Sequence, residues 1–257
     1  MRKLLIYDAS CPMCRVYTKG LVATDPSGCL SRISNDKLTD RELINRLDQQ
    51  RARHEIPMID LDGGKTLYGI DTWLCAIGQH SQQLKKLLSF GWVRVALQRI
   101  YAFISYNRRI IVTSAPGRWQ LLDLQPDFRL NYRLPFILLV LGISGVLFST
   151  INQAFEPVTA LVASQLISTT LYARVFKPGH FLETVLDYSG HLGMSLLIGG
   201  LFIKVGQVAN VSAFVLTGYA LLIGQHFIRT YRLGLNPWIS VWFTALVFLL
   251  LRPNGIF

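Results

Sequence analysis

Charged side chains are scarce in the second half of this 257-residue chain. Residues 134–257 hold only nine of them, whereas residues 1–71 hold eleven Lys and Arg and ten Asp and Glu. Hydrophobic residues make up 51% of the whole sequence, and a soluble protein of this size cannot hide so much apolar surface. The shortage of charge therefore excludes an entirely water-soluble chain and favours a soluble N-terminal part joined to a membrane part.

Acidic residues are almost missing from the middle of the chain. Residues 72–133 hold nine basic side chains and two acidic ones, so most of the net charge of +11 arises there. No recognition-helix or RNA-binding motif accompanies this basic segment, which argues against nucleic acid as a partner. A basic segment directly before apolar runs instead favours contact with anionic membrane lipids.

The N-terminus lacks the long apolar run of a secretory signal. Only four apolar residues, Leu4–Tyr7, separate Lys3 from Asp8, and a signal peptide needs a longer apolar core. We therefore expect the N-terminal part to stay in the cytoplasm. Cysteines are normally reduced there, so a cysteine pair is more often catalytic or metal-binding than structural.

Turn residues divide the N-terminal part into alternating strands and helices. The clusters Asp25-Pro26-Ser27-Gly28 and Asp62-Gly63-Gly64 mark the end of a helix and a hairpin turn. The resulting order, β-α-β-α-β-β-α, is that of a thioredoxin-like α/β domain. We expect strands at residues 3–7, 29–34, 58–61 and 66–68, and helices from residue 11 or 12 to before residue 25, at 40–53 and at 71–80.

Three domains follow from this pattern. We expect the α/β domain at residues 1–81, basic amphipathic linker helices at the membrane surface at residues 82–133, and an all-α transmembrane helix bundle at residues 134–257. In the bundle, five apolar runs approach the roughly 20 residues that cross a bilayer. These predicted spans lie at residues 134–152, 157–175, 185–203, 208–228 and 236–251.

The charges between the apolar runs orient them. Under the positive-inside rule, the side with more Lys and Arg is cytoplasmic. The division is six to two, which predicts a cytoplasmic N-terminus and, with five spans, an exported C-terminus at Phe257, in a bacterial-type inner membrane. The six are Arg129, Arg133, Arg174, Lys177, Arg229 and Arg232, and the two are Lys204 and Arg252. The alternative is that residues 177–190 form a re-entrant segment, which leaves four spans and a cytoplasmic C-terminus.

A Cys11-x-x-Cys14 motif follows the first expected strand. Its spacing places both sulfurs on the first turn of a helix, within reach of one disulfide. The helix N-terminus favours a thiolate at Cys11, which would attack a target disulfide before Cys14 resolves the mixed disulfide. The alternatives are a zinc site completed by Cys29 and Cys75, and no chemistry. Those two cysteines are isolated and lie in apolar settings typical of buried thiols, so we favour redox chemistry.

The segment His54–Asp60 reads H-E-I-P-M-I-D and is followed by a Gly-x-Asp element. It resembles glutaredoxins, whose active site also has the form Cys-Pro-x-Cys. The resemblance implies that Pro57 is cis and faces the disulfide, and that the Gly-x-Asp turn starts the next helix. It also implies a substrate-binding surface made of Pro12, Met13, Ile56, Gly69 and Asp71.

The stretch Tyr7–Cys14 reads Y-D-A-S-C-P-M-C. It resembles the DCC-type thiol–disulfide oxidoreductase family, named for an Asp before the cysteine pair in a Tyr-Asp-Gly-x-Cys-Pro-x-Cys motif. The Tyr…Asn-Arg element of that family is matched by Tyr101 and Tyr106–Arg108, so the resemblance spans roughly residues 3–112. Ala9 replaces the usual glycine, which makes the turn less permissive but leaves the cysteines unchanged.

Asp8 has two interpretations of equal weight. As a buried carboxylate it could accept the proton of Cys14, or it could cap the helix that begins at Cys11. The predicted catalytic residues are therefore Cys11, Cys14, Asp8 and Pro57.

Ionisable side chains interrupt the apolar runs. Glu183, Asp187 and His191 are spaced i, i+4, i+8 and share one helix face, and Gln225 and His226 lie near the end of the fourth run. One hypothesis is a quinone or haem site coupled to the thiols, with His191 and His226 as axial ligands, because ionisable groups at membrane depth are often functional. The interpretation that we favour is interhelical hydrogen bonding.

Two functions fit these patterns. The first is a membrane-anchored thiol–disulfide oxidoreductase that acts on protein or small-molecule thiols and disulfides at the cytoplasmic face of the membrane. The second is a redox-sensing or binding module that regulates a membrane transport or assembly bundle without catalytic turnover. The paired cysteines favour the first function.

Overall fold

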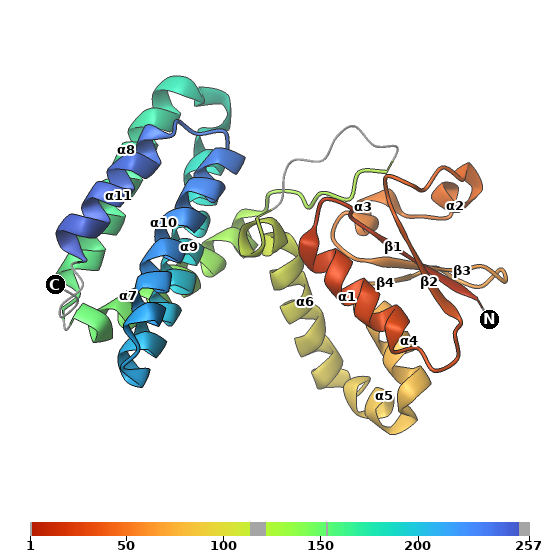
Figure 1. Cartoon of the computed structure of the whole chain (residues 1–257). Helices are drawn as coiled ribbons and strands as arrows, with labels where there is room; N and C mark the ends of the chain where they lie inside the picture. The colour runs from red at the N-terminus through yellow and green to blue at the C-terminus, as the bar shows by residue number, and fades with distance from the viewer. Residues whose placement is uncertain (1, 114–121, 153, 252–257) are drawn as a thin grey trace. The chain divides into compact units, whose positions relative to one another are not determined.

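The computed structural model describes residues 2–113, 122–152 and 154–251, and it divides into two compact units, Met1–Arg129 and Leu130–Phe257 (Figure 1). The first unit contains β1 (Lys3–Tyr7), α1 (Pro12–Ala23), β2 (Leu30–Ser34), α2 (Arg41–Asn45), α3 (Gln49–Ala52), β3 (Pro57–Asp60), β4 (Leu67–Tyr68), α4 (Ile70–His80), α5 (Gln82–Leu88) and α6 (Gly91–Ile111). The second contains α7 (Leu130–Asn152), α8 (Glu156–Phe176), a 3-10 turn (Pro178–His180), α9 (Phe181–Ala209), α10 (Ser212–Arg232) and α11 (Trp238–Leu250).

A four-stranded sheet in the order β2-β1-β3-β4 forms the centre of the first unit. β1 pairs with β2 in parallel and with β3 antiparallel, and β4 lies antiparallel beside β3. Since successive side chains of a strand point to opposite faces, the sheet contributes side chains to two separate hydrophobic clusters. Leu5 and Met58 face the cluster that contains the cysteines, while Ile6 and Ile59 belong to the other cluster.

Helices contribute to both of these cores. α1 and α4 supply Cys14 and Ala76 to the cluster around Leu5, and α2 and α3 supply Ile44 and Ala52 to the cluster around Ile6. The strand–helix order expected from the sequence is present, with one difference. The single helix expected over residues 40–53 is two helices, α2 and α3.

Two aspartates explain that division. The carboxylate of Asp40 accepts a hydrogen bond from the N–H of Glu42 at 2.9 Å and so begins α2. The carboxylate of Asp48 accepts from the N–H of Arg51 at 3.0 Å and begins α3. The cap at Asp48 satisfies an N–H group that a continuous helix would have bonded internally, so a new helix begins there.

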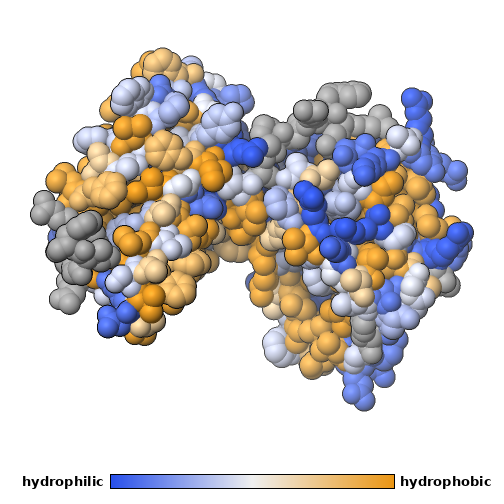
Figure 2. Space-filling model, in the orientation of Figure 1, coloured by the Kyte–Doolittle hydropathy of each residue, from blue (hydrophilic) through white to orange (hydrophobic). Residues whose placement is uncertain are grey.

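α5 and α6 form a pair that is bent by 80°. α6 is amphipathic, since Arg108 and Ile110 are buried while Trp92 is 72% exposed. After α6 the chain returns to the sheet, where Leu122 and Leu124 join the cluster around Ile6. The sequence Ala115-Pro116-Gly117 predicts a break after these helices, and this segment lies outside the described residues. Figure 2 shows apolar side chains gathered over α6 and over much of the visible face of the second unit.

α7 and α9 of the second unit run parallel. Three contacts follow one another in the same direction along both helices, from their N-terminal to their C-terminal ends. Because α7 and α9 are parallel, α8 must return the chain between them. These contacts are Arg133 with Asp187 at 3.2 Å, Ser144 with the Gly193 carbonyl at 3.2 Å, and Lys204 with the Thr150 carbonyl at 3.2 Å.

The fold class expected from the sequence, a thioredoxin-like domain followed by about five transmembrane spans, is wrong. The chain is largely helical, with one small sheet near its N-terminus and a helical C-terminal region. Within the described residues, two helices are long and apolar enough to cross a membrane, Leu130–Asn152 and Pro178–Ala209, or up to three if the bent pair α5–α6 is one span. The chain is therefore compatible with a membrane protein, and its described part contains two or three such helices rather than five.

Length and polarity account for the missing spans. α11 has 13 residues, about 20 Å at 1.5 Å per residue, which is short of the roughly 30 Å hydrocarbon core. α10 carries His226, Arg229 and Arg232 in its last two turns, and α8 carries Gln165 among several Ser and Thr residues. The exported C-terminus depended on an odd number of spans, and Phe257 itself lies outside the described residues.

Candidate active site

The cysteine motif lies where β1 ends and α1 begins. Cys11 is the N-cap of α1, with φ −96° and ψ 106°, and its Sγ accepts a hydrogen bond from the N–H of Cys14 at 3.3 Å. Pro12 follows as the first helical residue, a position where the missing N–H of proline does no harm. The carbonyl of Asp8 accepts from the N–H of Cys11 at 3.2 Å and closes the turn. The sulfur of Cys11 thus occupies the helix N-terminus, where negative charge is stabilised.

The two thiols differ strongly in acidity. A hydrogen bond from the Cys14 thiol lowers the pKa of Cys11 to about 7; burial opposes this shift, and the charge of Arg108 adds to it. The same hydrogen bond, together with burial, raises the pKa of Cys14 well above its ordinary value. Each cysteine is only 1% exposed. Near neutral pH, Cys11 is therefore ionised more readily than a free cysteine, while Cys14 keeps its proton.

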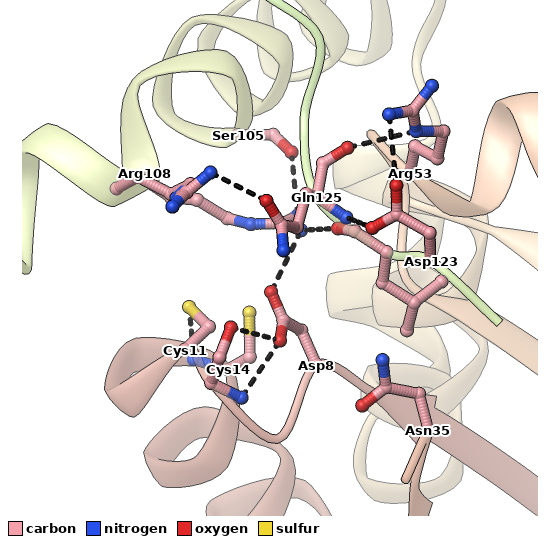
Figure 3. A network of polar contacts seen from close by, with 12 residues as sticks. Asp8, Cys11, Cys14, Asn35, Arg53, Ser105, Arg108, Asp123 and Gln125 are labelled. Carbon is pink, nitrogen blue, oxygen red and sulfur yellow. Dashed lines mark hydrogen bonds and ion pairs between the residues drawn. The ribbon is translucent and has the colours of Figure 1, made fainter. Parts of the chain in front are cut away.

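Arg108 of α6 brings a positive charge to the cysteines (Figure 3). Its Nη2 lies 3.5 Å from Oδ2 of Asp8, and both side chains are buried, at 4% and 3% exposure. Nη1 donates to the Ser105 hydroxyl at 3.4 Å, and Nη2 donates to the carbonyl of Leu124. Since losing either partner would leave a buried charge without compensation, the pair connects α6 firmly to the turn before Cys11.

Asp8 uses its two carboxylate oxygens differently. Oδ1 accepts from the N–H of Ser10 at 2.9 Å and from its hydroxyl at 2.6 Å. Oδ2 is buried beside Arg108 and accepts no hydrogen bond within the described residues. The capping position of α1 belongs to Cys11 and not to Asp8. Asp8 therefore shapes the turn and neutralises Arg108.

Asn35 joins this turn to the end of the first unit (Figure 3). Its Oδ1 accepts from the N–H of Ala9 at 2.9 Å, and its Nδ2 donates to the carbonyl of Leu122 at 2.9 Å. The side chain is 2% exposed. Sequence analysis did not single out Asn35, because one Asn after a strand resembles an ordinary turn residue.

Three hydrogen bonds hold the backbone at Ile56. Its N–H donates to the Tyr101 hydroxyl at 2.9 Å, and its carbonyl accepts from the N–H of Gly69 at 3.0 Å and from the Thr72 hydroxyl at 3.1 Å. Gly69 has φ +53°, and a Cβ there would lie 3.2 Å from the Tyr101 ring. Both the backbone conformation and the lack of space therefore favour glycine.

The prediction of a cis Ile56–Pro57 bond is wrong, since no described peptide bond is cis. Pro57 begins β3 and pairs with Tyr68, and the first residue of a strand is a position that tolerates a trans proline. The neighbours of Pro57 reach the cysteines instead. Ile56 and Met58 pack in the cluster that contains Cys11 and Cys14.

The other predicted substrate-binding residues lie at different distances from the motif. Met13 packs against the cysteine cluster, and Pro12 is exposed. Asp71 lies in the first turn of α4 and forms an ion pair with Arg94 of α6 at 2.7 Å, with both side chains partly exposed. Asp71 therefore joins α4 to α6.

The remaining two cysteines do not gather at the motif. Lys3 donates to the sulfur of Cys75 at 2.8 Å, and the thiol of Cys29 donates to the Ser27 carbonyl at 3.6 Å. Within the described ranges, no group of three His, Cys, Asp or Glu side chains could hold a metal ion. The four cysteines thus do not assemble the alternative zinc site.

His226 is engaged on both ring nitrogens. Nε2 lies 2.9 Å from the Tyr188 hydroxyl and Nδ1 lies 3.0 Å from the Ser240 hydroxyl. The ring stacks on Phe243 with centroids 3.9 Å apart. Since a haem ligand needs a free nitrogen lone pair, these contacts do not fit His226 as an axial ligand and agree with interhelical hydrogen bonding.

Asp187 and His191 contact two different helices. Asp187 pairs with Arg133 of α7, while Nδ1 of His191 lies 3.1 Å from Nη1 of Arg229 on α10. Gln225 accepts from Nε of the same arginine at 3.1 Å. The shared helix face expected from the spacing therefore serves as a polar contact between helices.

Arg108, Ser105 and Tyr101 were not predicted from the sequence to belong to the cysteine site. They come from α6, about 90 residues after the motif. The signal that could have found them was the Tyr…Asn-Arg element, because it places a basic residue in the same resemblance as the Asp before the cysteines. Hydrophobic patterning alone marked α6 as a surface helix.

No protein-family model, curated protein or solved structure matches the chain. The chemistry of the site therefore rests on its geometry.

Proposed function

We propose that the protein is a membrane-anchored thiol–disulfide oxidoreductase that uses Cys11 and Cys14. The observation that carries the proposal is the sulfur of Cys11 at the N-cap of α1, where the N–H and the thiol of Cys14 both stabilise its thiolate. Thiol–disulfide exchange needs a thiolate nucleophile and a second thiol that resolves the mixed disulfide. Protein or small-molecule thiols and disulfides are the substrates.

The reaction proceeds in two exchanges. The thiolate of Cys11 attacks one sulfur of a target disulfide, forms a mixed disulfide and releases the other target sulfur as a thiolate, which takes up a proton. Cys14 then loses its proton and attacks the sulfur of Cys11. This second exchange forms the Cys11–Cys14 disulfide and releases the second target thiol, so two electrons pass from the protein to the target. The reverse sequence oxidises a target dithiol.

Asp8 and Arg108 have separate roles in this proposal. Arg108 stabilises the thiolate of Cys11 by its charge. Asp8 receives the proton of Cys14 through Oδ2, which is buried and accepts no hydrogen bond from a described residue. The ion pair between them holds both groups in place before the exchange. It is lost while Asp8 carries the proton and forms again when the proton leaves.

We also propose that the chain is a DCC-type thiol–disulfide oxidoreductase. The support is that two separate parts of the resemblance meet. Asp8 from the first motif and Arg108 from the Asn-Arg element form one buried ion pair beside the cysteines. If the resemblance reflects a common function, the cysteine motif and the Asn-Arg element should belong to one site, as they do here.

We place the redox unit on the cytoplasmic side of a bacterial-type inner membrane. The parallel helices α7 and α9 start on the same side, and each start carries two basic residues close by. Lys204 alone lies near the C-terminal end of α9 within the described residues. Basic residues concentrate on the cytoplasmic side of short spans. The four residues at the helix starts are Arg129, Arg133, Arg174 and Lys177.

The membrane surface partner in this proposal is anionic lipid. α5 and α6 carry exposed apolar side chains, including Leu87 at 63% and Trp92 at 72% exposure. Lys85, Lys86 and Arg94 lie on the same two helices. Apolar side chains beside basic ones are typical of helices that lie in the interface of an anionic membrane.

Catalytic disulfide exchange tests the proposed function. The full chain in lipid nanodiscs is given a fluorescent glutathione mixed disulfide, with glutathione as the reductant. We expect turnover that Cys11→Ser abolishes, while Cys29→Ser leaves the rate unchanged as the matched control. A wild-type rate no higher than that of Cys11→Ser would contradict the proposal.

A further inference from the structure

A cavity of about 410 Å³ lies beside the cysteine motif in the first unit. α1, α4, α5 and α6 supply its walls, and the proposed exchange reaction does not use it. Aromatic rings form part of the lining, with Tyr17 and Trp73 in contact at 5.4 Å between ring centroids. Its volume lies in the range of small-molecule sites, roughly 300–1,000 Å³. The walls therefore suit a flat, apolar ligand.

The polar part of the lining is small and chemically specific. The lining residues with polar side-chain groups are Cys14, Ser105 and Arg108, together with the aromatic residues Tyr17, Trp73 and Tyr101. Nε of Arg108 is buried and donates no hydrogen bond within the described residues. An unsatisfied buried donor costs free energy, and a ligand oxygen would relieve that cost. The ligand is therefore apolar with at least one hydrogen-bond acceptor.

The cavity is also bounded by the helices that have an apolar exterior. Ile100 and Ile104 line it and are still 55% and 39% exposed. α5 and α6 together are long and apolar enough for one membrane span. A ligand dissolved in lipid could therefore reach the cavity along α6.

We infer that this cavity binds the ring of a lipid-soluble quinone, which oxidises the Cys11–Cys14 dithiol. The inference rests on the proposed function and adds the co-substrate to it. The flat ring of a quinone would pack against the aromatic walls, and its carbonyl oxygens would accept a hydrogen bond from Arg108. Its apolar tail would lie along the exposed apolar side chains of α6. The residue that links the cavity to the chemistry is Cys14, which belongs to both.

The reaction balances without another reagent. The Cys11–Cys14 disulfide bond forms, and the two thiols give up two electrons and two protons. The quinone takes both electrons and both protons, so its two carbonyl oxygens become hydroxyls. The resulting disulfide then oxidises a target dithiol by the reverse of the exchange described above, and the hydroquinone returns to the lipid.

Anaerobic oxidation by a quinone tests the inference. The reduced full chain in nanodiscs is mixed with a fully substituted short-tail ubiquinone, which cannot add covalently to thiols. Quinone absorbance and free thiols are followed together. We expect one quinone consumed per disulfide formed, with a rate that saturates as the quinone concentration rises.

Variants that fill the cavity make the test specific. Leu97→Trp is expected to lower the quinone rate at least tenfold relative to the rate of disulfide exchange by the same variant. Ile104→Trp serves as the second filling variant if Leu97→Trp does not fold. Gln98→Trp is the matched control, because Gln98 is an exposed neighbour outside the lining, and it should leave both rates unchanged.

The outcomes separate this inference from the proposed function. Disulfide exchange without quinone oxidation would overturn the inference and leave the proposed function standing. Quinone oxidation that neither filling variant slows would show reaction outside the cavity, and would also overturn the inference. If the wild type shows no disulfide exchange with glutathione, the proposed function fails, and the inference fails with it.

Discussion

At the scale of single residues, Asp8 and Arg108 form a buried ion pair beside the reactive sulfur of Cys11. Asp8→Asn removes the counter-charge of a buried arginine, so we expect a loss of about 3–5 kcal/mol in the free energy of unfolding. The pKa of Cys11 should also fall, because the negative charge of Asp8 raises it. Denaturant unfolding and the pH dependence of iodoacetamide alkylation measure the two effects.

The double variant Asp8→Asn/Arg108→Met provides the control for this prediction. It removes both charges and should recover most of the lost stability, because no charge is then left buried alone. A single Asp8→Asn variant as stable as the wild type would show that the pair is unimportant.

Cys14 controls the acidity of Cys11 through its thiol. Cys14→Ala removes the first cause of the lowered pKa, so the pKa of Cys11 should rise from about 7 toward the ordinary value of about 8.5. Below the raised pKa the thiolate fraction falls, so alkylation of Cys11 at pH 7 should slow about tenfold. Cys14→Ser keeps a hydroxyl donor and should shift the pKa less. Equal alkylation midpoints in Cys14→Ala and the wild type would contradict this assignment.

The sequence predicted the position of Cys11 at the start of α1 but not its full surroundings. The CxxC spacing and Pro12 were enough to place the sulfur at the start of α1, because a helix N-terminus is a local feature. Arg108 acts across about 90 residues, and local patterns do not encode such a contact. The cis form of Pro57 was expected by resemblance alone, and the structure has it trans.

At the scale of helices and strands, glycines allow α9 and α10 to pack closely against each other. A Cβ on Gly199 would lie 2.5 Å from Cβ and 2.9 Å from Cα of Leu222, so Gly199→Ala must push the helices apart. We expect a loss of about 1–3 kcal/mol, typical of overpacking. Gly224→Ala is the matched control, because its Cβ would meet nothing within 4 Å. Thermal unfolding in detergent compares the two, and equal melting temperatures would contradict close packing at Gly199.

The exposed apolar side chains of α5 and α6 should lie in lipid. Trp92 is 72% exposed, so brominated lipids should quench its fluorescence in nanodiscs. The difference between the wild type and Trp92→Phe isolates this signal. Quenching should be stronger with anionic than with neutral lipids, because Lys and Arg flank the apolar positions. No difference in quenching between the two proteins would place Trp92 in water.

The elements were predictable where their signals are local. β1 has the expected bounds, whereas the caps at Asp40 and Asp48, which divide residues 40–53 into two helices, were not predicted. The membrane spans were overcounted because apolar runs were judged by length. Polar residues such as His226 and Arg229 at the end of α10 make hydrogen bonds inside the bundle. The mean hydropathy of a stretch of sequence does not show which residues these groups will contact.

The whole molecule combines a dithiol in one compact unit with apolar helices in the other. Composition predicted this division, because charge is abundant before residue 72 and scarce after residue 133. It did not predict that α6 and residues 122–129 belong to the site, since contacts such as that between Asn35 and Leu122 join segments far apart in the chain. In the proposed function, the first unit carries the dithiol and the apolar helices of the second unit anchor the chain in the membrane.

Trapping of the mixed disulfide tests the central claim most directly. The full-length Cys14→Ser and Cys11→Ser variants are each exposed to a disulfide substrate, and the adducts are located by peptide mass spectrometry. We predict a stable mixed disulfide on Cys11 in the Cys14→Ser variant, because no resolving thiol remains, and no adduct on Cys14 in the Cys11→Ser variant. Equal trapping at both cysteines, or none at Cys11, would contradict a thiol–disulfide oxidoreductase with Cys11 as its nucleophile.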